Sequence, residues 1–522
     1  MSTLLREYLV DRLTEAREHD ALTRRRLQAG ETMVEVPSTG KGVSTAYEQL
    51  RNAAENAEEH LLLQRAIKRF YRRTLFLPLR PHEKSAAVGQ ELIVELLQAG
   101  YLPNTRVSEA VRSAIDQLIM QTQAGYHQLV ETGSVPREKL VDWVLAYLSV
   151  NTEQLLNPNT VPAAYTMFAY QYFLQAIPRA TFADWPDDDD YGLCLYLATY
   201  QALRKTDVDV VRADLCQLYT VSPSERAPFI ELNQKLDRLY SSELTTHLRR
   251  IVSLNGAPLR VLYSMIVNEP HVDRLLADRT VFLDHYRVAI EKTYAQAEAR
   301  LNKGLVKSIV FIFITKTLIG LGLEVPYDIL VHGAVMPVPL LVNLLFPPLY
   351  MASLRIGITL PPKHNTAALL HSIEAILYDE RPKHIKLPRH RRVTPVRQLV
   401  YTVFFALPIA LGIAALHALH FTVLQMVIFF VFFSTASSLG FRLSSQLREL
   451  EVARTSSGFF GSLIDFFYLP FIMMGQWLSR KYSRLNLVTR FLDIAIELPL
   501  KAVLRLARQW IRFLDERREE LY

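Results

Sequence analysis

The sequence predicts an all-α membrane protein in which a large helical domain precedes the membrane part. Residues 399–441 contain no Asp, Glu, Lys or Arg, which leaves room for two membrane crossings of about 20 residues each. The chain before them places apolar residues at helical spacing, as at Val111, Ile115 and Ile119, with no sustained alternation of period two. Residues 1–304 carry 35 Lys and Arg against 38 Asp and Glu, whereas residues 305–522 carry 24 against 14.

The bulk composition agrees with a soluble part joined to a membrane part. Of the 522 residues, 50% are apolar and 21% are charged, and the mean hydropathy of +0.09 is intermediate. Because the positive charge belongs to the second half, we expect the lipid bilayer and its anionic headgroups as partners, and we expect no nucleic acid. The two cysteines, Cys194 and Cys216, are predicted to be reduced core residues.

The first 304 residues are predicted to form an N-terminal helix with a linker (1–45) and an all-α domain (46–304). The N-terminus mixes both charge signs and lacks an apolar core, so we expect no signal peptide and a cytosolic domain. No fixed repeat period is evident, which leaves a degenerate α-solenoid as an alternative. The expected helices cover 3–28, 46–76, 83–99, 105–131, 137–150, 160–177, 191–204, 207–219, 224–254, 257–268 and 272–303.

Two transmembrane hairpins, and thus four crossings, are predicted after residue 304. The first, 305–354, turns at Glu324–Asp328 and is broken by Pro337, Pro339, Pro347 and Pro348, which favour kinks or a re-entrant shape. A basic loop, 355–398, follows with nine Lys and Arg. The second hairpin, 399–441, turns near His417–His420. Because Lys and Arg collect in cytoplasmic loops, the N-terminal domain and the C-terminus are predicted to be cytoplasmic.

The last 81 residues of the 522-residue chain are predicted to lie at the membrane surface. Residues 442–482 contain an apolar stretch, 458–478, in which Asp465 and Pro470 disfavour a plain crossing. A re-entrant or interfacial segment is therefore expected there. Residues 483–522 read as amphipathic basic helices, which are typical of the bilayer interface. The alternative is that their apolar face packs on the helical domain.

Three polar residues are candidates for an intramembrane site: Lys316, Asn343 and Asp465. An ionisable side chain inside a span is by default a functional hypothesis. Lys316 would contact an anionic substrate or pair with Asp465. The alternative is that the Lys316 side chain extends toward the polar turn at Glu324 and so reaches the membrane surface.

A basic helix face is the candidate for binding an anionic surface. Its cations follow helical spacing with aromatic residues among them. Such a face suits lipid headgroups, nucleic acid or an acidic partner, and lipid is favoured over nucleic acid because the soluble domain is net acidic and tethered to a membrane. An ordinary solvated face is the alternative. The face consists of Arg65, Lys68, Arg69, Arg72 and Arg73.

Other features do not predict chemistry. His417 and His420 are too few ligands for a zinc site, and the acidic run at Asp184 and 187–190 suits a loop that caps the next helix. No HExxH, GxSxG, GxGxxG or paired CxxC motif occurs, so no catalytic residue, metal site or cofactor is predicted. We expect a non-enzymatic membrane-anchored scaffold that docks protein partners. The alternatives are a transporter or channel subunit and, third, a lipid-modifying enzyme.

Overall fold

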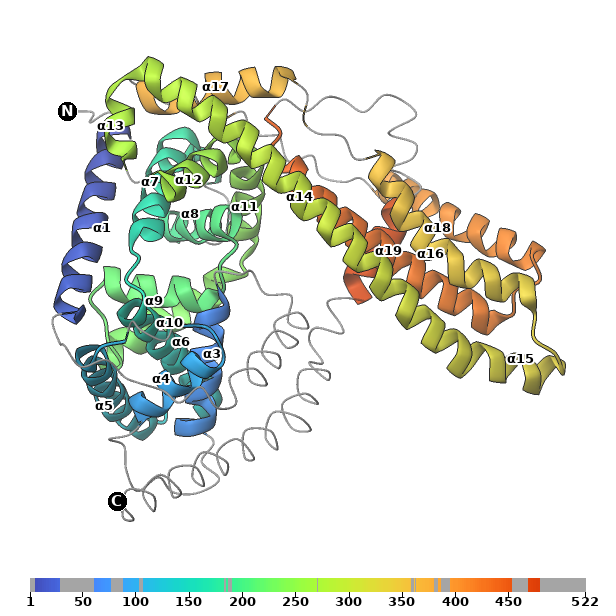
Figure 1. Ribbon diagram of the computed structural model, residues 1–522, viewed down its shortest axis with the longest axis horizontal. Helices are drawn as coiled ribbons and strands as arrows, with labels where there is room; N and C mark the ends of the chain where they lie inside the picture. Colours follow the sequence, from blue (N-terminus) through green and yellow to red (C-terminus); the bar gives the residue numbers. More distant parts are fainter. Residues whose placement is uncertain are drawn as a thin grey trace, which may run out of the picture. The chain divides into compact units, whose positions relative to one another are not determined.

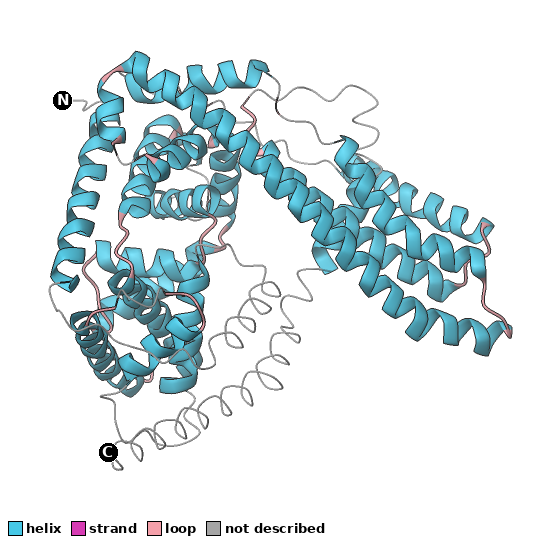
Figure 2. Ribbon diagram, in the orientation of Figure 1, coloured by secondary structure: helices cyan, strands magenta, loops and turns pink. Residues whose placement is uncertain are grey.

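The computed structural model is all-helical, and the residues that it describes contain no strand (Figure 2). The chain divides into two compact units: the described residues of unit 1 lie within 5–252 and 378–385, and those of unit 2 within 253–377 and 395–478. The structure describes residues 5–28, 61–76, 88–102, 107–182, 185, 190–269, 271–357, 361, 363–379, 384–385, 395–452 and 468–478.

Unit 1 is built from helices that are antiparallel or inclined to their neighbours in the chain (Figure 1). Helix α5 packs on α4 and α6, and α6 also packs on α3 and α9. The elements are α1 (Leu5–Gln28), α3 (Leu62–Tyr71), the π-helical turn η2 (Arg72–Phe76), α4 (Val88–Gln98), α5 (Glu109–Glu131), α6 (Arg137–Leu156), α7 (Val161–Ala176), the 3-10 turn η4 (Arg179–Phe182), α8 (Tyr191–Thr199), the π-helical turn η6 (Tyr200–Arg204), α9 (Val208–Leu218), α10 (Arg226–Tyr240) and α11 (Glu243–Asn255).

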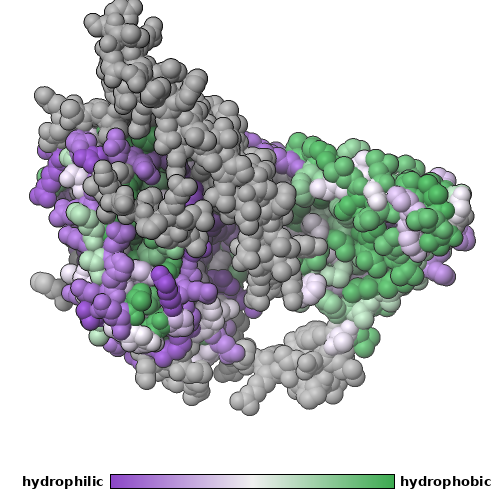
Figure 3. Space-filling view, turned by 90° about the horizontal axis from the view of Figure 1, so that it is seen from below, coloured by the Kyte–Doolittle hydropathy of each residue, from purple (hydrophilic) through white to green (hydrophobic). Residues whose placement is uncertain are grey.

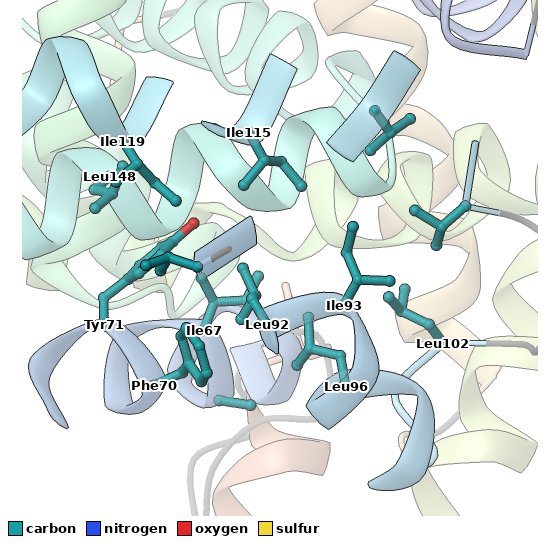
Figure 4. Close-up of a cluster of buried hydrophobic side chains, with 14 of the residues drawn as sticks. Ile67, Phe70, Tyr71, Leu92, Ile93, Leu96, Leu102, Ile115, Ile119 and Leu148 are labelled. Atoms are coloured by element: carbon teal, nitrogen blue, oxygen red, sulfur yellow. The ribbon is translucent and has the colours of Figure 1, made fainter. Parts of the chain in front are cut away.

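One hydrophobic core of unit 1 lies where α3, α4, α5 and α6 meet. Ile67 and Tyr71 of α3, Leu92 of α4 and Ile115 of α5 all have 0% exposure, and Figure 4 shows these side chains pointing toward one another. The Tyr71 hydroxyl is 2.9 Å from Thr152 Oγ1, so its polar end is satisfied inside the core. Helical spacing of apolar residues therefore produces the packing that the sequence predicts for this part.

Unit 2 is organised around one long helix. Helix α14 (Arg279–Ile319) continues through the π-helical turn η7 (Gly320–Glu324) into α15 (Val325–His332). Asp278 caps its start by accepting hydrogen bonds from the backbone N–H groups of Thr280 and Val281 at 2.8 and 3.2 Å. The other helices are α12 (Ala257–Asn268), α13 (Val272–Ala277), α16 (Pro337–Gly357), α17 (Lys363–Tyr378), α18 (Pro395–Ala418) and α19 (Val423–Arg448).

Two helices of unit 2 are long and apolar enough to cross a membrane: Arg279–Val331 and Val423–Ser445. Shorter apolar helices cover Pro337–Ser353 and Phe405–Ala418. Large apolar side chains point outward along all four, among them Leu318, Leu341, Leu407 and Val427. Figure 3 shows hydrophobic surface gathered over this part of unit 2, whereas the described surface of unit 1 that faces the viewer is mainly hydrophilic.

Several predicted helices have different ends in the structure. The helix expected over 224–254 is two helices, α10 and α11, separated at Ser241 and Ser242. The helix expected over 272–303 is interrupted at Asp278, whose side chain caps a new helix instead of continuing the first. Helix α14 then runs through Leu305 without a break. The change in composition at Leu305 therefore marks a change in the surroundings of one helix and not its start.

The predicted turn at Glu324–Asp328 is wrong. Both residues lie in the continuous α14–α15 helix with 0% exposure, and the chain reverses instead at 333–336, where Gly333 has a φ of 71°. Pro326 lies directly after the π-helical turn η7, in the first turn of α15. The carboxylates of Glu324 and Asp328 point inward, because polar side chains of α16 and α19 bind them there.

Proline does not break the first hairpin in the way that the sequence suggested. Helix α16 runs as one element through Pro347 and Pro348, and its start at Pro337 puts Pro339 in the first turn. The turn predicted near His417–His420 is confirmed: α18 ends at Ala418 and α19 begins at Val423. Thr422 caps α19 in a reciprocal capping box with Gln425.

The apolar stretch after α19 is described only in its last part. Residues 468–478 are helical, and Phe471 packs on Phe433 of α19 with 4.5 Å between the ring centroids. Gly475 allows a close approach, because a Cβ there would lie 2.7 Å from the Cβ of Ser438. This segment therefore packs against α19. The predicted amphipathic helices within 483–522 lie outside the described residues.

Candidate functional site

A buried polar network lies where the α14–α15 helix, α16 and α19 pack together. Lys316, Glu324 and Asp328 come from the long helix, Asn343 from α16 and Gln425 from α19. Each of the five side chains has 0 or 1% exposure. Because buried polar groups are costly unless they are paired, the contacts of each of these side chains determine what the site can do.

The π-helical turn aligns the three ionisable residues of the long helix. Lys316 and Glu324 are eight residues apart, and in a regular α-helix this spacing overshoots two turns by about 80°. In the π-helical turn η7, Gly320–Glu324, each residue rotates about the helix axis by a smaller angle, because the hydrogen bonds span five residues. Glu324 therefore comes onto the face of Lys316, and Asp328 follows one turn later.

Lys316 and Glu324 form an ion pair inside unit 2. Lys316 Nζ donates a hydrogen bond to Glu324 Oε1, and the two side chains are 1% and 0% exposed. The ammonium also lies 5.0 Å from the ring centroid of Phe432 on α19, a cation–π distance. The pair is thus shielded from solvent, and each charge depends on the other for its stability.

Asn343 connects this ion pair to α19. Its Nδ2 donates to Glu324 Oε2 at 3.1 Å and to the backbone carbonyl of Gln425 at 3.3 Å. These two acceptors fix the orientation of the amide, since a flipped Asn343 would place its oxygen against both of them. In that orientation Asn343 Oδ1 is buried and has no hydrogen-bond partner among the described residues.

Gln425 holds the second carboxylate. Its Nε2 donates to Asp328 Oδ1 and Oδ2 at 3.1 and 3.0 Å, and its Oε1 accepts from the Thr422 backbone N–H at 3.0 Å. The capping box at the start of α19 thereby fixes the orientation of the Gln425 amide that donates to Asp328. The backbone N–H of Met336, in the 333–336 loop, also donates to Asp328 Oδ2 at 3.3 Å.

The sequence identified part of this network. Lys316 and Asn343 were predicted as intramembrane polar residues, and the structure brings both to the carboxylate of Glu324. The Lys316 side chain does extend to Glu324, as the alternative expected, but both side chains are buried, at 1% and 0% exposure. The suggested partner Asp465 lies outside the described residues. Glu324, Asp328 and Gln425 were missed, although the spacing of four between the two acids signals a shared face.

The predicted anionic-surface face lies on α3 and η2, and its cations contact acidic side chains of the chain itself. Arg65 pairs with Asp207 at 2.7 Å and Lys68 with Asp209 at 2.5 Å. Arg73 pairs with Glu95 at 2.7 Å, Arg72 pairs with Asp142, and Arg69 is half-buried. These cations therefore join α3 to α4, α6 and the start of α9, and binding of an anionic surface by them stays a prediction.

The other sequence features have structural roles. Cys194 and Cys216 are both buried and are not joined by a disulfide, which confirms the prediction of reduced core residues. Asp190, the described member of the acidic run at 187–190, pairs with Lys235 and Arg238 of α10 at 2.5 and 2.6 Å. His417 and His420 are exposed at the turn between α18 and α19. In the described part of the chain, no group of three or more His, Cys, Asp or Glu side chains is placed to hold a metal.

Comparison with known proteins gives no relative. The chain matches no protein-family model, and neither a curated protein nor a solved structure matches it.

Proposed function

We propose that the chain is a multi-pass membrane protein that crosses the bilayer four times. The outward apolar side chains of unit 2 support this, because those between Val306 and Val331 extend over about 38 Å at the α-helical rise of 1.5 Å per residue. A hydrocarbon core is roughly 30 Å thick. Helices α16 and α18 supply the shorter crossings, and α19 supplies the fourth.

The two ends of this helical bundle differ in charge. Arg355 of α16 pairs with Glu298 of α14 at 2.8 Å, and Leu443 of α19 packs against Gly304, so these three helices share one end. That end also carries Lys303, Lys307, Arg442 and Arg448, whereas the opposite turns, 333–336 and 419–422, contain no Lys or Arg. The asymmetry supports a cytoplasmic basic end, and we call the opposite end the distal end.

We further propose that the protein acts as a membrane-anchored scaffold, in which unit 1 docks protein partners on the cytoplasmic side. The observation that carries this proposal is the contrast between the two units: unit 2 has an apolar exterior, while unit 1 has its own hydrophobic cores and a mainly hydrophilic described surface (Figure 3). A separately packed polar unit fixed to an anchor is suited to holding partners at the membrane.

Cysteine labelling tests the topology. Because Cys194 and Cys216 are buried, single cysteines can be added at exposed Val335 in the distal loop and at exposed Ser224 in unit 1. A membrane-impermeant maleimide should label Val335→Cys in intact cells and Ser224→Cys only after permeabilisation. The reverse pattern would overturn the orientation, and equal access at both sites in intact cells would exclude the crossings.

Crosslinking of the full chain in cells tests the scaffold. A photoreactive residue at Ser224 should capture a defined partner, and that partner should leave the membrane fraction when the chain is deleted. The same residue placed at lipid-facing Leu341 is the matched control. If the captured protein remains at the membrane without this chain, docking by unit 1 is refuted.

A transporter or channel subunit is the second candidate, and the buried network favours it. Ionisable side chains inside a membrane protein commonly mark ion or substrate paths, and Lys316, Glu324 and Asp328 lie along one helix face. Purified protein in liposomes should then carry protons or Na⁺ faster than empty liposomes, and Lys316→Met, under conditions where it remains folded, should abolish the difference. Equal flux with and without the protein would reject transport of these two ions.

A further inference from the structure

The buried network carries one more negative than positive charge. Lys316 supplies one positive charge, while Glu324 and Asp328 supply two carboxylates, and all three side chains are 0 or 1% exposed. Glu324 is neutralised by Lys316 through their ion pair. Asp328 is the carboxylate that remains, and an isolated buried charge is among the most costly groups in a protein interior.

The contacts of Asp328 stabilise it without neutralising it. Its donors are the Gln425 amide, at 3.1 and 3.0 Å, and the Met336 backbone N–H at 3.3 Å, and both donors are uncharged. Among the described residues no cation pairs with Asp328. Neutral donors reduce the cost of burying a carboxylate, but they leave its net charge in place.

A second observation points to a missing positive charge. Asn343 Oδ1 is buried without a hydrogen-bond partner among the described residues, and its amide partner atom Nδ2 is bonded to Glu324. The network therefore contains a carboxylate that lacks a counter-charge and an oxygen acceptor that lacks a donor, and Gln425 bonds to both residues. Oxygen acceptors of this kind bind a proton or a hard metal cation.

The charge balance determines the valence of the ligand. One positive charge makes the network of Lys316, Glu324 and Asp328 neutral, whereas a divalent ion would leave a buried excess of positive charge. The site also lies near the distal end, because Met336, which bonds to Asp328, belongs to the exposed loop 333–336.

We propose that Asp328, in the buried network that also contains Glu324 and Asn343, forms a site for one monovalent cation that exchanges with the distal side. The ligand is a proton or a small alkali ion. A proton would convert the Asp328 carboxylate to the carboxylic acid, and an alkali ion would pair with that carboxylate. Binding requires only this one positive charge and no redox partner. Exchange with the distal side rests on the proposed membrane topology, but not on whether unit 1 docks partners.

Thermal unfolding of the purified full chain in detergent tests the proposal. The wild type is compared with Asp328→Asn in NaCl, KCl and choline chloride at equal ionic strength, each over a range of pH. Asp328→Glu keeps the charge and should keep the response. Asp284→Asn is the matched control, because Asp284 is an exposed carboxylate on the same helix.

Each ligand gives its own result, because binding to the folded state raises the Tm. If the ligand is an alkali ion, Na⁺ or K⁺ should raise the Tm of the wild type over choline by about 2–4 °C or more, and Asp328→Asn should not respond. If the ligand is a proton, the salts should be equivalent, and the wild type should lose Tm relative to Asp328→Asn as the pH rises.

The other titratable groups near the site are controlled by the same comparison. Lys316 and Glu324 lie within the network, His417 and His420 are exposed at the neighbouring turn, and α16 and α19 contribute the amides of Asn343 and Gln425. All of them are present in both proteins. Infrared spectra of the wild type add a direct readout, since a protonated Asp328 gives a carboxylic C=O band that Asp328→Asn lacks. The proposal would be overturned if the Tm of the wild type and the Tm of Asp328→Asn responded alike to every salt and every pH, and if the wild type lacked that band.

Discussion

Two ion pairs, one in each unit, differ in their surroundings. In unit 1, Arg212 is paired with Asp237 at 2.6 Å, and the Asp237 side chain is 33% exposed. Trp143 Nε1 adds a hydrogen bond to the same carboxylate at 3.1 Å. In unit 2, Lys316 and Glu324 are 1% and 0% exposed, and their further contacts are with other buried groups.

The difference follows from what surrounds each unit. The described exterior of unit 1 is mainly hydrophilic (Figure 3), so water can solvate one side of an ion pair and replace a lost partner. The exterior of unit 2 around the network is apolar, and its charged groups can be satisfied only by one another. Losing one partner should therefore cost far more in unit 2 than in unit 1.

The largest effect is expected at the buried ion pair. Lys316→Met leaves Glu324 buried without its counter-charge and should lower the free energy of unfolding by about 3–5 kcal/mol. The double variant Lys316→Met with Glu324→Gln should recover most of this loss. Chemical unfolding in detergent measures the cycle, and exposed Lys307→Met is the control. Additive effects of the two substitutions would show that the pair is not coupled.

The next effect is expected in unit 1 and depends on pH. Burial raises the pKa of Glu153 to about 7, an increase that nearby Arg204 opposes and Asp214 adds to. Because the pKa is higher in the folded state than in the unfolded state, stability should be lost as the pH rises through about 7. At high pH, Glu153→Gln should then be more stable than the wild type by up to about 3 kcal/mol, at 1.36 kcal/mol per pKa unit.

Thermal unfolding between about pH 5 and pH 9 measures this difference. Exposed Glu131→Gln is the matched control in the same unit, and it should follow the wild type across the range. A constant difference between Glu153→Gln and the wild type at every pH would contradict the assignment to Glu153.

Close helix packing should give a smaller effect. A Cβ at Gly475 would overlap the carbonyl oxygen of Ser434 and lie 2.7 Å from the Cβ of Ser438. Gly475→Ala should therefore lower the stability of unit 2 by about 1–3 kcal/mol. Gly322→Ala, where a Cβ meets nothing within 4 Å, is the control. Equal Tm values for the two variants would mean that the segment 468–478 does not pack closely on α19.

The smallest effect is expected at the surface of unit 1. The side chains of Arg72 and Asp142 are paired but 48% and 57% exposed. Arg72→Gln should change stability by less than about 1 kcal/mol, and the change should shrink further in high salt. If flotation with anionic vesicles falls strongly in this variant while its Tm stays unchanged, the predicted binding of an anionic surface gains support. If vesicle flotation and the Tm both fell in this variant, Arg72 would have a structural role.

Local patterns predicted the helices but not their partners. Apolar spacing located most helices of unit 1, and the uncharged run 399–441 located α18, α19 and their turn, because periodicity and turn composition act over a few residues. The polar residues at Glu324 and Asp328 misled the same reasoning. Charge and proline there are typical of a surface turn, and only buried partners elsewhere in the chain make a helix compatible with them.

The sequence by itself determined that this protein is helical, that its charge is uneven along the chain, and that Lys316 and Asn343 are unusual in their apolar surroundings. The tertiary structure determined which side chains Lys316 and Asn343 contact. Asn343 and Gln425 are 82 residues apart, and their contact depends on how α16 and α19 pack on the long helix. Because no local pattern encodes that packing, the network around Glu324 and Asp328 emerges only in the folded chain.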